Sequence, residues 1–490
     1  MPARLDRTTL RRQVAGSRAA YERDLRQLVE IPTVSVDPSH AADMARGARA
    51  AAEVLERHGA TAAVLPTDGF PFIVGELATG ASNPTVTVYN HMDVQPADGD
   101  DWTRAPFELH VEKDRFFGRG ATDDKGPALA ALLGARLAVE AGVPINVRFL
   151  WEMEEEIGSP SFARGLRRYA SRLATDSVVV SDTIWVARGK PALSTGLRGL
   201  AGATLRLETG TRDVHSGLCG GAARNPIADL VAVLAATYDA RTGRVKIPGF
   251  YSDVVPPTRA ELDSFERSGF TAAAFRRAHG LRVLRHDSAR DLMRAIWAAP
   301  TFEVHGIAGG YQGPGVKTVI PPWAEAKVSF RLVPGQQPKR VIAALRAHVK
   351  KLDPRVVVRA ESELEPFLGE TSGPLAAAAR DAVEFGFGRQ PALVREGGSI
   401  GAVLSMQRAF GCPVTLLGLS LPEHGYHGPN EFFDWGQASG GALAFARYLE
   451  QLAALGRPQR ARRGGAPAGG AVRSGGRGAA PRRGARRRGL

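Results

Sequence analysis

Acidic and histidine residues follow four short apolar runs of this 490-residue sequence, at the point where each run ends. The junctions are Val86–Tyr89 before Asn90-His91-Met92-Asp93, Asn146–Trp151 before Glu152–Glu156, Val178–Val180 before Ser181-Asp182, and Val414–Leu417 before the loop with His424 and His427. If these runs are strands of an open α/β sheet, ligands bind in the crevice outside their carboxyl ends. The side chains of all four junctions would then converge on one crevice.

So many carboxylates in one crevice repel one another unless a cation neutralises them. Asp123-Asp124, just before a helical pattern, add two more. Oxygen and imidazole ligands without a thiolate suit zinc, manganese or cobalt in an open catalytic site. Taken singly, Glu152–Glu156 could be a solvated helix start, and Asp123-Asp124 could be helix caps. Their joint placement at successive strand ends favours a metal site.

The elements that must position these residues form an alternating series in the first half of the chain. Apolar runs and helical patterns alternate at Thr85–Tyr89, Gly126–Gly142, Ile145–Trp151 and Ser177–Val180. This alternation predicts an α/β domain with a mainly parallel central sheet and helices on both faces.

From Gly196 the pattern changes to that of a compact α+β unit. It has expected strands at Leu200–Leu207, Ala326–Val333 and Arg355–Ala360, a helix Ile227–Tyr238 after the N-cap Asn225 and Pro226, and a helix entered at Pro338. The α/β pattern returns from about Leu364, with a helix at Leu375–Phe385, a strand at Val414–Leu417 and a helix at Gln437–Leu455. We therefore predict a catalytic domain over residues 1–192 and 364–456, interrupted by an inserted domain over residues 193–363.

The composition restricts the class of protein. With 44% hydrophobic and 23% charged residues the chain is of ordinary globular type, and its length suggests two or three domains. It has no apolar stretch long enough to span a membrane, and its first 26 residues lack the apolar segment of a secretory signal. Two cysteines, Cys219 and Cys412, cannot form a disulfide framework and favour a reducing compartment. We therefore expect a cytoplasmic protein.

Most of the net charge of +14 belongs to the last 34 residues, which contain eleven arginines and no acid. Without them, 53 basic residues face 50 acidic ones. The segment 457–490 is otherwise almost entirely Gly, Ala and Pro, which predicts a disordered tail. The tail could make weak contact with a polyanion, whereas the near-neutral body gives no indication of a nucleic-acid-binding module.

Several motifs resemble one known family, the di-metal amidohydrolases that include aminoacylase, acetylornithine deacetylase, succinyl-diaminopimelate desuccinylase, carboxypeptidase G and the carnosinase-type (cytosolic nonspecific) dipeptidases. The motifs extend over nearly the whole body in the expected order: His91–Pro96, Gly118–Pro127, Glu155–Ser159, Asp213–Gly217, Lys317–Pro321, Phe330–Pro334, Glu396–Ser399 and His427–Glu431. The dipeptidase branch is the most similar. The resemblance implies a zinc-peptidase-like catalytic domain and an inserted domain that serves as lid and dimerisation domain.

The resemblance also implies two divalent ions per subunit, zinc or else manganese or cobalt. Five residues would hold them: His91 and Asp182 on one ion, Glu156 and His427 on the other, and Asp123 bridging both. Asp93 would fix the His91 ring. Glu155 would be the general base that activates a water between the ions.

Residues of the inserted domain and the last motifs would bind the substrate in such an enzyme. His215 would reach across a homodimer and stabilise the tetrahedral oxyanion in the partner's site. Arg331 would bind the free carboxylate of the substrate, and Thr318, Gly398 and Ser399 would contact its backbone. An Asp at position 182 favours a dipeptidase over an N-acyl-amino-acid deacylase or a carboxypeptidase, in which Glu is usual.

Some positions depart from the family pattern or leave a choice open. Asn90 stands where Gly often precedes the histidine. His424 stands where an acid is expected, and it is an alternative ligand to His427. The run of acids from Glu152 also allows a shift of one residue in the position of the base, although Gly158-Ser159 supports Glu155.

Two further interpretations belong to other classes. Gly397–Gly401 fits the G-x-S-x-G pattern of a serine hydrolase, with a histidine downstream, but this interpretation leaves the carboxylates unexplained. Alternatively, the body is a non-catalytic scaffold and its Arg-rich tail binds polyanions. All five expected metal ligands and the base are present, which favours an enzyme.

Overall fold

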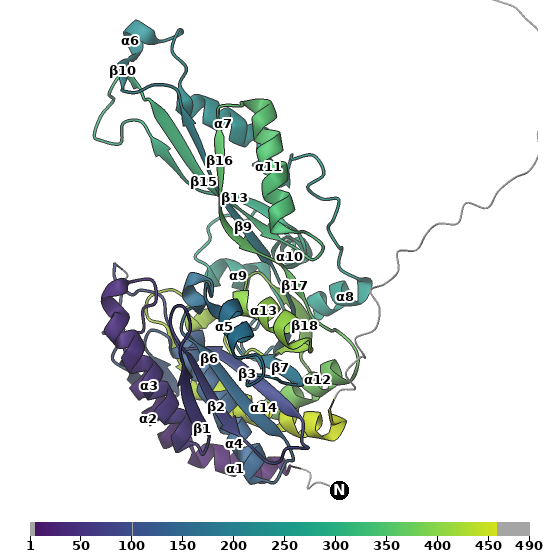
Figure 1. Ribbon diagram of the computed structural model, residues 1–490. Helices are drawn as coiled ribbons and strands as arrows, with labels where there is room; N and C mark the ends of the chain where they lie inside the picture. The colour runs from purple at the N-terminus through teal and green to yellow at the C-terminus, as the bar shows by residue number, and fades with distance from the viewer. Residues whose placement is uncertain (1–4, 100, 458–490) are drawn as a thin grey trace, which may run out of the picture. The chain divides into compact units, whose positions relative to one another are not determined.

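A six-stranded sheet lies at the centre of the catalytic segment in the computed structural model, which describes residues 5–99 and 101–457 (Figure 1). Its strands in spatial order are β1 (Thr61–Leu65), β2 (Phe72–Leu77), β6 (Asn146–Glu152), β3 (Thr85–His91), β7 (Ser177–Val180) and β19 (Val414–Leu416). β3 runs parallel to β6 and β7, and β7 runs parallel to β19, whereas β2 is antiparallel to both of its neighbours. The mainly parallel sheet expected from the sequence is confirmed.

Helices cover both faces of this sheet, so its strands are apolar on both sides. Val86 and Val88 of β3 join one hydrophobic cluster, whereas Tyr89 joins the cluster on the opposite face. The first cluster includes residues of α1 (Arg7–Gly16), α2 (Arg18–Val29), α3 (Ala41–Arg57), α4 (Gly126–Glu140), α12 (Pro374–Phe387) and α14 (Trp435–Leu455), and the second those of α5 (Phe162–Arg168) and α13 (Gly401–Phe410).

A four-stranded antiparallel sheet has a hydrophobic cluster of its own. Its strands in spatial order are β13 (Thr301–Gly309), β15 (Trp323–Leu332), β9 (Gly199–Glu208) and β16 (Val357–Leu364), and α7 (Pro226–Thr237) and α11 (Pro338–Leu352) pack on it. The N-cap prediction is confirmed, because the Asn225 side chain accepts the N–H groups of the first turn of α7. β16 begins later than Arg355, where the sequence predicted its start. Arg355 still belongs to a turn, in which its N–H donates to Asp353 Oδ1.

The shorter elements connect these two sheets. β8 (Ala192–Leu197) pairs in parallel with β18 (Ala392–Glu396) and antiparallel with β17 (Phe367–Leu368). Other small pairings join β4 (His110–Glu112), β5 (Arg115–Phe117) and β20 (Phe432–Asp434), β10 (Val214–His215) and β14 (Val319–Ile320), and β11 (Tyr238–Asp239) and β12 (Arg244–Val245). The remaining α-helices of the described ranges are α6 (Ser216–Cys219), α8 (Arg259–Arg267), α9 (Ala272–Ala278) and α10 (Ala289–Met293).

The two main hydrophobic clusters share no residue. This supports our proposal of a catalytic segment over residues 1–192 and 364–456 and an inserted segment over residues 193–363. By its contacts, however, the chain as far as Arg457 forms one compact unit, so these boundaries remain a proposal. The tail predicted to be disordered lies, apart from Arg457, outside the described residues. None of the helices that the structure describes is long and apolar enough to cross a membrane.

Candidate metal centre

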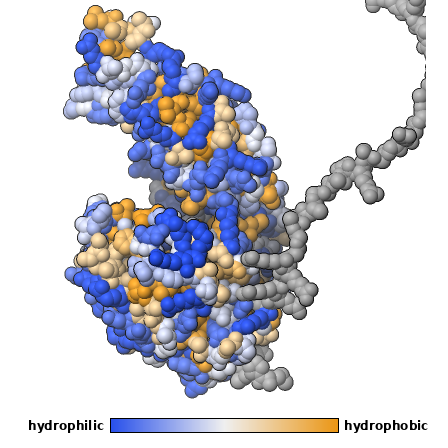
Figure 2. Space-filling model, viewed as in Figure 1, coloured by the Kyte–Doolittle hydropathy of each residue, from blue (hydrophilic) through white to orange (hydrophobic). Residues whose placement is uncertain are grey.

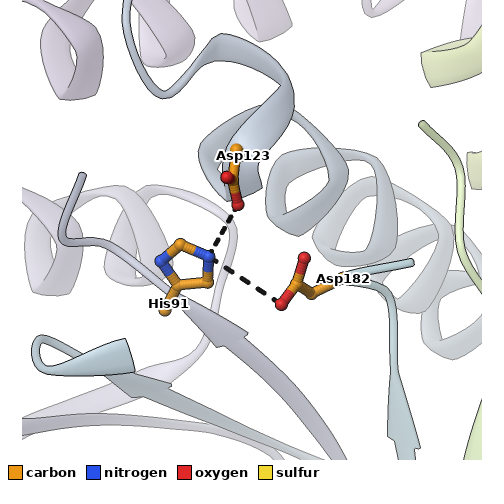
Figure 3. Close-up of side chains that lie close together, drawn as sticks. All are labelled: His91, Asp123 and Asp182. Atoms are coloured by element: carbon orange, nitrogen blue, oxygen red, sulfur yellow. Dashed lines mark hydrogen bonds and ion pairs between the residues drawn. The ribbon is translucent and has the colours of Figure 1, made fainter. Parts of the chain in front are cut away.

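His91, the last residue of β3, directs one ring nitrogen toward two carboxylates from other elements (Figure 3). Its Nε2 lies 3.0 Å from Asp123 Oδ1 and 4.0 Å from Asp182 Oδ2. Asp182 follows β7, the parallel neighbour of β3, so two adjacent strands deliver these side chains to one edge of the sheet. All three residues are buried, and one ligand atom of each lies within 4.8 Å of the others, an arrangement that could hold a metal ion.

A second group of possible ligands shares Asp123. His427 Nε2 lies 3.0 Å from Asp123 Oδ2 and 3.3 Å from Glu156 Oε2. Asp123 therefore presents one oxygen to each group. Its neighbour Asp124 instead accepts a hydrogen bond from Asn90 Nδ2 at 2.6 Å. We refer to the residues of the two groups as the candidate metal centre: His91, Asp123, Glu156, Asp182 and His427.

The electrostatics of this centre fit divalent cations. Burial and the charge of Asp123 raise the pKa of Asp182 to about 7, and burial also raises the pKa of Glu156. Hydrogen bonds with Asp123 and Glu156 raise the pKa of His427 to about 10. Both shifts mean that positive charge is strongly favoured here, which is the property that a cation site needs. The oxygen and imidazole donors suit zinc, manganese or cobalt.

Glu431 fixes the backbone around Asp123, in the helical turn Ala121–Lys125 that precedes α4. Its Oε1 accepts the N–H groups of Thr122 at 2.9 Å and of Asp123 at 3.1 Å. Its Oε2 accepts a hydrogen bond from Arg119 Nη1 at 2.9 Å. Sequence reasoning used Glu431 only to support the choice of His427 and missed this role, although an acid in the same motif as a proposed ligand was a signal for it.

Asp93 contacts both His91 and the turn that carries Glu155. Its carbonyl oxygen lies 3.0 Å from His91 Nδ1, and its carboxylate oxygen Oδ1 lies 3.5 Å from the same nitrogen. The carboxylate also accepts the N–H groups of Glu155 and Glu156, each at 3.1 Å. Asp93 therefore orients an imidazole and two further acids together, a wider role than the one expected from the sequence.

The Glu155 carboxylate accepts no hydrogen bond from any residue within 5–99 and 101–457, and burial raises its pKa well above the ordinary value. The other acids of the run are engaged elsewhere. Glu152 accepts hydrogen bonds from Tyr89 and Ser159, and Glu154 accepts the N–H groups of Phe70 and Ser161. This geometry favours Glu155 over its neighbours as the base.

His424, the alternative ligand, belongs to neither group. It is fully buried, its Nε2 lies 3.0 Å from Asp434 Oδ2, and its Nδ1 lies 2.9 Å from Thr122 Oγ1. The Leu421 N–H donates to the same Nδ1, so the ring carries its proton on Nε2 and is neutral. Burial lowers the pKa of His424 accordingly. His424 thus anchors the turn next to Asp123.

Arg331, Gly398 and Ser399 lie close together, and their common role in substrate binding stays a prediction. Arg331 Nη1 donates to Ser399 Oγ at 3.2 Å, and the Arg198 N–H donates to the Gly398 carbonyl at 3.1 Å. Ser399 lies between β18 and α13, as the G-x-S-x-G pattern requires. Its hydroxyl donates to the Arg198 carbonyl, and no histidine of the described ranges forms a hydrogen bond with it. The geometry of a serine nucleophile is therefore missing there.

His215 and Thr318 lie together but apart from the candidate metal centre. His215 pairs with Val319 between β10 and β14, and the Ser216 N–H donates to the Thr318 carbonyl. In Figure 1, β10 and α6 lie at the end of the four-stranded segment that points away from the six-stranded sheet. Apolar residues gather at this end in Figure 2. Leu218 of α6 is 85% exposed. No interaction between the described residues joins His215 or Thr318 to the centre.

Comparison with known proteins agrees with this geometry. Residues 87–451 match the family described as peptidase family M20/M25/M40. The chain is 31% identical over 455 residues to the human Beta-Ala-His dipeptidase, covering 88% of this chain and 90% of the relative. It is 33% identical over 400 residues to a Cys-Gly metallodipeptidase of Schizosaccharomyces pombe, covering 79% and 83%.

The chain belongs to peptidase family M20/M25/M40. Among solved structures it resembles human carnosine dipeptidase 1, with a TM-score of 0.80, 30% identity, and coverage of 92% and 100% of the two chains. An M20 family metallo-carboxypeptidase from Sulfolobus solfataricus has the same TM-score with 28% identity, and coverage of 88% and 98%. The expected resemblance, fold class and metallopeptidase activity are therefore confirmed, and the chain is an enzyme of this peptidase family.

Sequence reasoning did not assign a role to three further residues near the candidate metal centre. Tyr426 directs its hydroxyl toward Asp182 Oδ1 at 3.4 Å, and Gln95 Nε2 donates to Glu156 Oε2 at 2.7 Å. Glu396 is the last residue of β18, and burial raises its pKa to about 8. Gln95 and Glu396 lie inside motifs that the family resemblance already includes, and Tyr426 directly precedes His427, so nearness to a motif residue was the available signal.

The His424–Asp434 pair of this M20 chain gives a prediction on stability. Burial alone would raise the pKa of Asp434, but hydrogen bonds from His424 and from the Gln437 N–H lower it to about 2. A carboxylate with a lowered pKa in the folded state stabilises the fold at pH values above its unfolded pKa of about 4. This stabilisation is lost as the pH falls toward the pKa of the folded state. Asp434→Asn should therefore lower the free energy of unfolding by about 2 kcal/mol at neutral pH.

This loss should shrink as the pH falls from about 5 toward about 3, because the wild-type carboxylate is then losing its advantage. Urea unfolding of both proteins across this range measures the difference. Asp434 also accepts a hydrogen bond from Arg188 Nη2 at 2.9 Å. Asp381→Asn is a matched control, because Asp381 likewise pairs with an arginine but lies half-exposed on α12. A difference between Asp434→Asn and wild type that stays constant with pH would contradict the prediction.

Proposed function

We propose that this M20 peptidase hydrolyses the peptide bond of dipeptides with two divalent ions held by the candidate metal centre. The observation that carries the proposal is the position of Asp123, whose two oxygens face two separate groups of ligands at 3.0 Å from a histidine in each. His91 and Asp182 would complete the site of one ion, and Glu156 and His427 that of the other. Zinc is the metal we favour, with manganese or cobalt as alternatives.

Bound divalent ions supply Lewis acidity, which polarises the substrate carbonyl and lowers the pKa of a water molecule in the site. The proton transfers fall to Glu155. Its carboxylate accepts no hydrogen bond from the residues that the structure describes and has a raised pKa, which suits a group that first accepts a proton from the attacking water and then gives it to the leaving amine. Asp93 holds the backbone of Glu155 in place through the hydrogen bond at 3.1 Å.

The substrate is proposed from the side chains around Ser399 and from the relatives. Arg331 would bind the terminal carboxylate of the dipeptide, and Gly398, Ser399 and Thr318 would contact its backbone. Arg331 and Ser399 already share a hydrogen bond of 3.2 Å, so both can face one ligand. The two relatives reported above are named as dipeptidases, which supports a dipeptide over an N-acyl amino acid as the substrate.

We also propose that the enzyme works as a homodimer in which His215 acts in the partner's site. This is supported by the exposed position of His215 at an end of the inserted segment, apart from the centre of its own chain. Its imidazole would stabilise the oxyanion that forms when water attacks the carbonyl. The two cysteines, which form no disulfide, support a reducing, cytoplasmic location.

Metal removal and a substrate panel test this function together. Dialysis against a chelator should abolish dipeptide hydrolysis, and zinc, manganese or cobalt should restore it, because the acids of the centre need a cation. A fluorophosphonate that labels serine hydrolases should leave the activity unchanged. The panel should contain dipeptides, N-acyl amino acids and longer peptides.

If the enzyme prefers N-acyl amino acids, or removes single residues from the carboxyl ends of longer peptides, the proposed substrate class is wrong. The proposed metal chemistry would still hold. Full activity after exhaustive chelation would contradict the function itself.

A further inference from the structure

Arg198, between β8 and β9, holds the loop Gly397–Ser399 through three separate groups. Its backbone N–H donates to the Gly398 carbonyl at 3.1 Å, and its Nε donates to the Gly397 carbonyl at 3.2 Å. Its own carbonyl accepts the Ser399 hydroxyl. Because the backbone and the side chain of one residue contact three consecutive residues, Arg198 determines the shape of the loop that carries two proposed substrate contacts.

The Arg198 guanidinium also lies close to that of Arg331. Burial and the charge of Arg331 lower the pKa of Arg198 to about 10, and burial lowers the pKa of Arg331 as well. Neither arginine forms an ion pair with any residue of the described ranges. The charge of Glu303 raises the pKa of Arg198 slightly, but from beyond the distance of an ion pair. Glu396 of the same loop region instead accepts hydrogen bonds from Ile184 N–H and Ser194 Oγ.

Two half-buried cations with no carboxylate partner carry an electrostatic cost that an anion removes. Both are guanidiniums, whose planar donor geometry matches a carboxylate. Arg331 also borders a hollow of about 580 Å³ on the face of the four-stranded sheet, together with Leu200 and Ser329, so its side chain is accessible. The pair therefore has the charge and the donors that a carboxylate-binding site needs, and Arg331 has the access.

We propose that Arg198 is a second specificity-determining arginine, which binds the terminal carboxylate of the substrate together with Arg331 and shapes the Gly397–Ser399 loop around it. The proposal rests on the proposed peptidase function. It makes the enzyme selective for substrates with a free carboxyl end, because a neutral end leaves both guanidiniums without a counter-charge.

The test compares a dipeptide with the same dipeptide amidated at its carboxyl end, for the metal-loaded wild type, Arg198→Gln, Arg198→Lys and the control Arg206→Gln. Arg206 lies on β9 and pairs with Glu208 at the surface, away from the loop. In Arg198→Gln, kcat/KM for the free acid should fall by about 10- to 100-fold, as expected for a charge-assisted hydrogen bond. The value for the amide should change much less, so the preference for the free acid should shrink by a similar factor.

Arg198→Lys should lie between wild type and Arg198→Gln for the free acid, since it keeps the charge but not the fork of donors. It also keeps the test decisive if Arg198→Gln does not fold. Equal losses on the acid and the amide in both variants would overturn the proposal and leave Arg198 a merely structural residue. A metal-loaded wild type that hydrolyses neither substrate would instead refute the proposed function.

Discussion

Glu155→Gln should lower kcat for dipeptide hydrolysis by about 10²- to 10⁴-fold, the usual contribution of a general base. Glutamine keeps the size of the side chain but cannot accept the proton of the attacking water. The backbone of residue 155 would stay in place, because Asp93 holds it through the main-chain N–H. The metal content, measured by elemental analysis, should therefore stay near the wild-type value.

Glu154→Gln is the matched control, since the neighbouring carboxylate binds the N–H groups of Phe70 and Ser161 instead of facing the centre. It should lower the free energy of unfolding, because it weakens two buried hydrogen bonds, and it should change kcat much less than Glu155→Gln does. If Glu154→Gln lost activity as strongly as Glu155→Gln, or if Glu155→Gln lost its metal, the assignment of Glu155 as the base would be wrong. The comparison also decides the one-residue ambiguity that the run of acids leaves in the sequence.

Asp123→Asn should remove both metal ions and lower kcat/KM by about 10³-fold or more. One metal ion contributes several kcal/mol of transition-state stabilisation, and each 1.4 kcal/mol is a factor of ten. Both ions should be lost because Asp123 belongs to both groups of ligands. In Asp182→Asn, by contrast, only the ion beside His91 should be weakened, since Asp182 belongs to one group.

Asp124→Asn is the control for this experiment. Asp124 is adjacent in sequence and equally buried, but its carboxylate binds Asn90 and belongs to neither group. It should retain two ions per chain in elemental analysis or in a titration of the metal-free protein. Retention of one tightly bound ion by Asp123→Asn would show that Asp123 serves a single metal and would contradict a bridging role.

The sequence by itself determined the central sheet and the chemistry at its edge. Runs such as Val86–Tyr89 and Val178–Val180 are apolar on both faces, because helices cover both sides of the sheet, and this pattern is local and readable. The parallel direction of these strands then sends His91 and Asp182 to the same edge. Their types, an imidazole and a carboxylate, already favoured a metal.

The family resemblance supplied what periodicity could not. The choice of Asp123 over Asp124 depends on the turn Ala121–Lys125, and the choice of His427 over His424 depends on a loop without periodic pattern. The structure gives each of these alternatives a separate environment. Asp124 lies against Asn90, and His424 lies between Thr122 and Asp434.

Only the tertiary structure decided how the functional side chains are held. Glu431 binds the backbone of Thr122 and Asp123, and Arg198 binds the Gly397–Ser399 loop, although about 300 and 200 residues separate these partners along the chain. Contacts of this range depend on how the strands and helices pack, and no local pattern of residues encodes them. The sequence therefore determined which chemistry is present, and the packing of distant segments decided which residue performs each part of it.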